Sequence, residues 1–122
     1  MKQNVAVIGN TGWGRTIASF LSRNGHRVGL LTRTEAEGLE LRAGPAEYLP
    51  THSAPLALEG AGFVVWAVPS QTVRANALSL TGAVPAGVCH VSVAKGLEVE
   101  SGKRMTEVLR EVLGGRQMRG IC

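Results

Sequence analysis

Short, continuous apolar runs alternate along this chain with segments in which apolar residues recur every three or four positions. The runs are typical of buried strands, and the recurring spacing predicts amphipathic helices. Glycines follow several of these segments and mark where they end. We expect strands at residues 5–8, 26–31, 63–68 and 88–93, a strand beginning at 120–122, and helices at 13–24, 35–42, 70–80 and 101–113.

Two of the expected helices begin at a serine that can act as an N-cap, Ser70 and Ser101. Residues 48–53 fit no single element, and residues 55–59 fit one or two helical turns. The position of a third strand is therefore left open by the pattern.

Strands that alternate with helices in this order are typical of βαβ units and a parallel sheet. The predicted fold class is α/β: a Rossmann-like, doubly wound, mainly parallel sheet in three layers. The run FVVWAV at 63–68 is apolar throughout, which indicates a strand buried on both faces. At 122 residues, we expect one domain, residues 1–122.

The charge balance adds information about the ligand. Thirteen Lys and Arg against nine acidic residues give a formal net charge of +4, which fits either a basic surface without a special role or an anionic ligand. The arginines are scattered and aromatic residues make up only 4% of the chain, whereas nucleic-acid binding needs a basic cluster with stacking aromatics. We therefore expect a small phosphorylated ligand and no nucleic acid.

The two cysteines, Cys89 and Cys122, form neither a disulfide framework nor a metal-binding spacing. The chain has no apolar run long enough for a signal peptide or a membrane span. We expect a cytoplasmic protein with no metal site and no membrane association.

Polar residues follow four of the predicted strands, and in a parallel sheet those strand ends share one edge, where open α/β sheets bind ligands. The groups are Gly9–Gly14, Thr32–Thr34, Pro69–Gln71 and Ala94–Gly96. Four such groups at one edge predict a binding site.

The first group departs from the dinucleotide pattern G-x-G-x-x-G, because Thr11 occupies the second glycine position. A side chain held there at positive φ would cost about 1–3 kcal/mol. We expect Gly12 to take over the permissive role and the Thr11 hydroxyl to bond a phosphate oxygen; a glycine turn without a ligand is the alternative. Backbone N–H groups at the start of the following helix would face the pyrophosphate.

Arg33 and Lys95 indicate what else the edge binds. An arginine after the second strand accommodates the 2′-phosphate of NADP, so NADP is favoured and NAD is not excluded. A lysine after a buried strand can hold a phosphate or polarise a carbonyl group. For either residue the alternative is a solvated side chain without a ligand.

Five stretches resemble, in order, the amino-terminal half of bacterial-type NAD(P)-dependent glycerol-3-phosphate dehydrogenases. They are VAVIGNTGWG, RNGHRVGLLTR, EYLP, GAGFVVWAVPSQTVR and SVAKGLEVESGKRMTEVLREVLG. The resemblance implies transfer of a hydride between NAD(P)H and dihydroxyacetone phosphate, giving sn-glycerol 3-phosphate. It also implies that Lys95 contacts cofactor and substrate in the active site without being the general base. The cofactor-binding residues it implies, with those of the glycine loop, are Gly9, Asn10, Thr11, Gly12, Trp13, Gly14, Arg33, Tyr48, Val68, Pro69 and Lys95.

The sequence departs from this family at two places. The segment between Tyr48 and Phe63 is shorter, and the chain ends at Cys122, where the family continues into a helical domain that carries the general-base lysine and most of the substrate pocket. We expect a truncated cofactor-binding domain, inactive or nearly so alone, which leaves open whether the chain is itself an enzyme.

Two alternatives remain. One is a stand-alone, non-enzymatic nucleotide-binding or regulatory module. The other is a ketopantoate-reductase-like or 3-hydroxyacid dehydrogenase, against which the run Lys95–Glu98 argues. A half-enzyme would expose apolar surface and a strand edge, so we also expect a homodimer.

Overall fold

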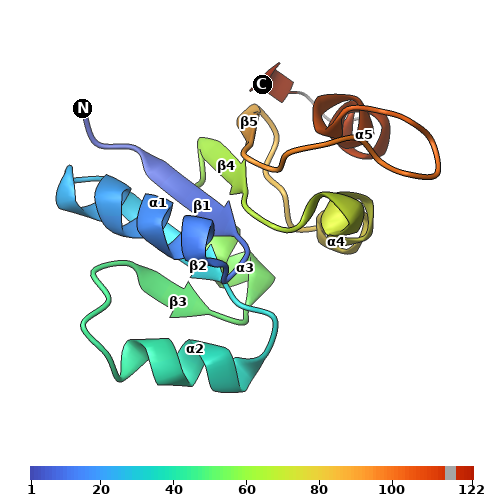
Figure 1. Ribbon diagram of the computed structural model, residues 1–122. Helices are drawn as coiled ribbons and strands as arrows, with labels where there is room; N and C mark the ends of the chain where they lie inside the picture. Colours follow the sequence, from blue (N-terminus) through green and yellow to red (C-terminus); the bar gives the residue numbers. More distant parts are fainter. Residues whose placement is uncertain (115–117) are drawn as a thin grey trace.

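The computed structural model describes residues 1–114 and 118–122. Strands and helices alternate through this part of the chain, as the apolar pattern predicts (Figure 1). In chain order the elements are β1 (Asn4–Ile8), α1 (Gly12–Arg23), β2 (Arg27–Leu31), α2 (Glu35–Arg42), β3 (Leu49–Thr51), α3 (Ala54–Leu58), β4 (Phe63–Trp66), the 3-10 helix η1 (Ser70–Thr72), α4 (Val73–Leu80), β5 (Val88–Ser92), α5 (Met105–Leu113) and β6 (Met118–Ile121).

The described strands form one sheet in the order β3-β2-β1-β4-β5-β6, and every neighbouring pair is parallel. Val7 of β1 lies opposite Leu30 of β2 on one side and Val65 of β4 on the other. The chain therefore winds outward from β1 in one direction and from β4 in the other. The carboxyl ends of β1 and β4 meet at the point where the direction reverses, which is where open α/β sheets bind ligands.

Apolar side chains cover both faces of the sheet. On one face, Val5 and Val7 pack with Ala18 of α1, and Leu41 of α2 joins them at the margin. On the other face, a larger cluster joins β1 and β4 to α3, α4 and α5. Figure 1 shows α1 against β1 and β2, with α4 and α5 beside the later strands. The predicted three-layer, doubly wound fold is confirmed.

Local chemistry explains where the helices differ from the expected bounds. Ser70 opens the short helix η1 without capping it, and α4 begins only at Val73. The last helix begins at Met105 instead of Ser101, because Gly102 turns the chain at φ +71° and Arg104 is still extended. In the part of the chain that the structure describes, no helix has both the length and the apolar character to cross a bilayer.

The third strand lies in the segment that the apolar pattern left open. β3 has only three residues, and its Pro50 pairs with Leu30 of β2 at the edge of the sheet. Proline has no backbone N–H to donate, and an inner strand uses its N–H groups toward both neighbouring strands, so an edge position suits it. A segment this short has too few residues for an alternation to be recognised.

Trp66 and His90 form a polar contact inside the larger apolar cluster. The indole N–H of Trp66 donates to Nδ1 of His90 over 3.1 Å, and the two ring centroids are 6.0 Å apart. His90 is 1% exposed, and burial lowers its pKa below the ordinary value. Because Nδ1 accepts a hydrogen bond, the neutral ring carries its proton on Nε2.

We expect the free energy of unfolding to fall as the pH drops through about 6.5, the ordinary pKa of histidine. Below that pH the unfolded chain protonates His90, whereas burial keeps the folded ring neutral. The unfolded state then binds more protons, so stability is lost by up to about 1.4 kcal/mol per pH unit until the lowered pKa is reached.

The matched variant is His90→Gln, which keeps an acceptor for the indole N–H and cannot titrate. Urea unfolding from about pH 8 to about pH 5 should show a shallower loss of stability for this variant than for the unaltered protein. His26 and His52 are present in both proteins, so the comparison isolates His90. Parallel stability profiles would contradict the assignment.

Candidate functional site

The loop from β1 to α1 passes very close to the end of β4. Gly9 has φ +121°, and a Cβ atom there would lie 2.6 Å from the carbonyl oxygen of Ala67. A Cβ atom at Gly14 would lie 2.1 Å from the carbonyl oxygen of Gly9. Both positions therefore require glycine, the first for backbone conformation and close approach, the second for packing of α1 on the loop.

Thr11 is not held at positive φ, so no backbone strain arises there. Its φ is −107°, and among the described residues only glycines have positive φ. Gly9, not Gly12, is the residue of this loop that needs the left-handed region. The Thr11 hydroxyl accepts from the Gly14 N–H over 3.0 Å and donates to the carbonyl oxygen of Ala67 over 2.8 Å. Its proton is thus directed into the protein instead of toward a phosphate.

The N-terminus of α1 is open above Gly12. A Cβ atom at Gly12 would meet nothing within 4 Å, and within the described residues the N–H groups of Gly12 and Trp13 donate to no acceptor. Unpaired amides at a helix N-terminus carry partial positive charge and attract anions. This end of α1 has the space and the donors to hold a diphosphate.

A hollow of about 350 Å³ lies beside this N-terminus. Its walls come from the β1–α1 loop and from the segments that follow β4 and β5, which confirms that the parallel strands bring these groups to one edge. Trp13 is 70% exposed at its rim, and Lys95 is also exposed. The lining residues are Thr11, Trp13, Ala67, Val68, Pro69, Ser70, Val93, Ala94 and Lys95.

The segment that carries Lys95 is anchored by side chains of the neighbouring loop and helix. Gln71 accepts from the Val99 N–H over 2.9 Å and donates to the carbonyl oxygen of Leu97 over 2.8 Å. Arg74 makes two hydrogen bonds of 2.9 Å to Glu98, and with Ser101 it lowers the pKa of that carboxyl group. These contacts fix the backbone after β5, from which Lys95 projects.

A second group of polar side chains lies at the ends of β1 and β2. Glu37 of α2 accepts from Nδ2 of Asn10 over 3.0 Å and from Nε of Arg33 over 3.3 Å. The Asn10 bond is the main cause that lowers the pKa of Glu37, and Arg33 adds to it. The Arg33 side chain is otherwise 84% exposed. Sequence reasoning missed Glu37, which follows the predicted strand by several residues and reaches the loop only because α2 turns back.

Tyr48 lies away from the other predicted cofactor-binding residues, in the core. Its side chain is 9% exposed and packs with Val5, Ala18 and Leu30 under α1, and it does not line the 350 Å³ hollow. Burial raises the pKa of its hydroxyl group. A contact between Tyr48 and a cofactor stays a prediction.

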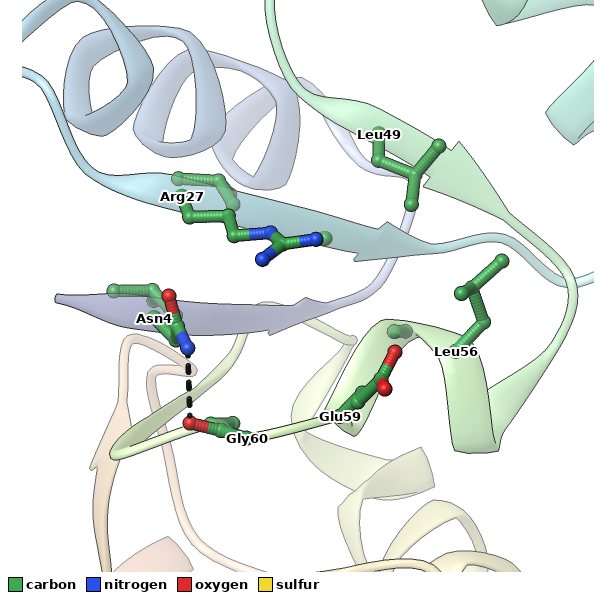
Figure 2. A pocket seen from close by; sticks show the side chains of 11 residues that line it. Asn4, Arg27, Leu49, Leu56, Glu59 and Gly60 are labelled. Carbon is green, nitrogen blue, oxygen red and sulfur yellow. Dashed lines mark hydrogen bonds between the residues drawn. The ribbon is translucent and has the colours of Figure 1, made fainter.

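A further hollow, of about 300 Å³, lies toward the opposite edge of the sheet (Figure 2). The first residues of β1, β2 and β3, namely Asn4, Arg27 and Leu49, line it, and Glu59 follows α3 at its other side. Asn4 donates to the carbonyl oxygen of Gly60 over 3.3 Å. No N-terminus of a long helix lines this hollow, so it does not share the chemistry of the carboxyl edge. Within residues 1–114 and 118–122 no three His, Cys, Asp or Glu side chains gather as metal ligands.

Comparisons with known proteins agree with this geometry. The family model described as "NAD-dependent glycerol-3-phosphate dehydrogenase N-terminus" matches residues 4–121. The glycerol-3-phosphate dehydrogenase [NAD(P)+] of Moorella thermoacetica is 37% identical over 91% of this chain, and that of Chlorobium luteolum is 40% identical over 93%. The chain spans 37% and 38% of the length of these two relatives.

The fold matches solved structures as well. The crystal structure of a glycerol-3-phosphate dehydrogenase from Coxiella burnetii superimposes with a TM-score of 0.84 at 23% identity, over 96% of this chain and 39% of that one. The match over residues 4–121 covers nearly the whole sequence. The chain therefore belongs to the NAD-dependent glycerol-3-phosphate dehydrogenase family and corresponds to its N-terminal part.

Proposed function

We propose that this chain is the NAD(P)(H)-binding domain of a glycerol-3-phosphate dehydrogenase. The observation that carries the proposal is the open N-terminus of α1, framed by Gly9 and Gly14 at the reversal point of the sheet. The relatives are named as NAD(P)+ enzymes, which supports the same cofactor here. The bound cofactor would supply or accept the hydride.

Each loop of the edge has a role in this proposal. The diphosphate lies over residues 9–14, where the amides of Gly12 and Trp13 donate to it. The adenosine end extends toward Arg33, whose charge favours NADP over NAD. The nicotinamide end lies against Val68 and Pro69, with Lys95 above it.

Lys95 also serves the substrate. The whole enzyme would reduce dihydroxyacetone phosphate to sn-glycerol 3-phosphate, and a cation beside the nicotinamide can hold the phosphate or polarise the carbonyl group. Hydride transfer needs the reacting atoms held about 3–3.5 Å apart. The relatives are more than twice as long as this chain, so we assign the remaining substrate contacts to a part beyond the match.

A stand-alone nucleotide-binding module is the second candidate, because the loop, the helix N-terminus and the hollow proposed for the nucleotide all lie within these residues. Such a module would bind the dinucleotide for storage or sensing in the cytoplasm without turnover. The proposed nucleotide contacts all come from this chain, so binding alone does not separate the two candidates.

We also propose that the chain forms a homodimer. In the described structure α1 packs over β1 and β2, whereas Phe63 of β4 and Val91 of β5 remain partly exposed on that face. They border an apolar hollow of about 310 Å³, and β6 forms the edge of the sheet beside them. Exposed apolar patches and strand edges favour association.

The first test is a titration with NADPH and NADH monitored by tryptophan fluorescence. Trp13 is exposed at the proposed site and Trp66 is buried, so binding should change mainly the Trp13 signal. Trp13→Phe should therefore lose most of the response. The absence of a response to both nucleotides, confirmed by calorimetry, would reject the proposal.

Two variants control this titration. Gly12→Asp and Gly12→Asn place side chains of the same size in the open space above α1. The carboxylate should weaken binding about tenfold more than the amide does, because it repels the diphosphate. Equal affinities for the two variants would show that the phosphates lie elsewhere.

The second test asks whether these residues alone catalyse the reduction. The chain alone should reduce dihydroxyacetone phosphate with NADPH at a rate close to the buffer blank, because it binds the cofactor without the remaining substrate contacts. The readout is NADPH absorbance over time. Robust turnover would show that the substrate site lies within these residues.

The third test is sedimentation equilibrium. The chain should sediment as a dimer at high micromolar concentration, and Val91→Lys should shift it toward the monomer by placing a charge on the apolar face. A monodisperse monomer at millimolar concentration would refute the dimer.

A further inference from the structure

Glu37 is the only carboxylate hydrogen-bonded to the β1–α1 loop among the described residues. The sequence contains nine glutamates and no aspartate, so no short acid can stand at the end of β2. The Glu37 side chain is 20% exposed and lies in the first turn of α2. The proposed adenosine end thus holds both an arginine and a carboxylate.

The two oxygens of this carboxylate contact different loops. Oε1 accepts from Asn10 over 3.0 Å, and Oε2 lies 3.3 Å from Nε and 3.2 Å from Nη2 of Arg33. Asn10 in turn accepts from Nη1 of Arg15 through Oδ1 over 2.9 Å. Glu37 therefore couples the loop that would hold the diphosphate to the arginine that would meet the 2′ group.

We propose that Glu37 determines how far the site prefers NADPH over NADH. This inference rests on the proposed function, because the end of β2 faces the ribose 2′ position only if a dinucleotide binds at this edge. A ribose 2′-hydroxyl can donate to the carboxylate, whereas a 2′-phosphate is repelled by it. Glu37 thus opposes the preference that Arg33 confers.

The charge of Glu37 matters more than its bond to Arg33. Arg33 is 84% exposed, and ion pairs with such exposed partners are weak, so a 2′-phosphate can draw the guanidinium away. The carboxylate then remains beside the phosphate with Asn10 as its partner. Discrimination against NADPH comes from that remaining negative charge.

The test compares Glu37→Gln with the unaltered protein. The substituted amide would keep an oxygen for Asn10 and remove the charge. The ratio of NADPH affinity to NADH affinity should rise about tenfold, and the rise should shrink at high salt. Glu40→Gln is the matched control, because Glu40 is exposed on the same helix and its loss changes the net charge equally. It should leave the ratio unchanged.

A second variant distinguishes a change in charge from a purely structural effect. Arg33→Gln should lower the same ratio, and loosening of the loop alone would weaken both nucleotides together and leave the ratio constant. If the unaltered protein binds a dinucleotide and Glu37→Gln leaves the ratio unchanged, the inference is overturned and the proposed function stands. If the unaltered protein binds neither nucleotide, both fall.

Discussion

The close approach of the β1–α1 loop to the end of β4 is the contact on which the geometry of the carboxyl edge depends. Gly9 permits it, because any side chain there would collide with the carbonyl group of Ala67. The Thr11 hydroxyl then bonds that same carbonyl oxygen and caps α1 through the Gly14 N–H. One hydroxyl group thereby ties the start of α1 to the strand across the reversal point, so the direction of the helix N-terminus is set by the sheet.

The elements that the sequence predicted well are those whose signal is local. FVVWAV and the run around Val7 are apolar without interruption, and both are inner strands. The glycine loop was recognised, but the hydrogen bonds that the Thr11 hydroxyl makes within the protein were not predicted, because one of its partners lies 56 positions away. The position of Glu37 at this site was not predicted for the same reason, since its partner Asn10 is 27 positions away in the sequence. Tertiary contacts of this kind leave no trace in spacing or composition.

The two ends of the edge are held by different interactions. At the β1 end, backbone approach and one hydroxyl group fix the loop, whereas beyond β5 charged side chains do so. Arg74 joins Glu98 to Glu111, and hydrogen bonds from Arg74 and Lys103 lower the pKa of Glu111 to about 2. Both carboxylates are therefore ionised at neutral pH. The Lys95 segment is held by a network whose charges are mostly neutralised within it, which leaves the charge of Lys95 available to a ligand.

The capping role of Thr11 also limits how many N–H groups the N-terminus of α1 can donate to an anion. The Gly14 N–H is occupied by the hydroxyl group, so only the amides of Gly12 and Trp13 remain for an anion. A diphosphate held by two amides needs further positive charge nearby, since each such bond is individually modest. Arg15 lies near the start of α1, Arg33 and Lys95 flank the loop, and the chain carries a net charge of +4. In the proposed complex, the basic side chains around the edge would therefore compensate for the Gly14 N–H that the Thr11 hydroxyl occupies.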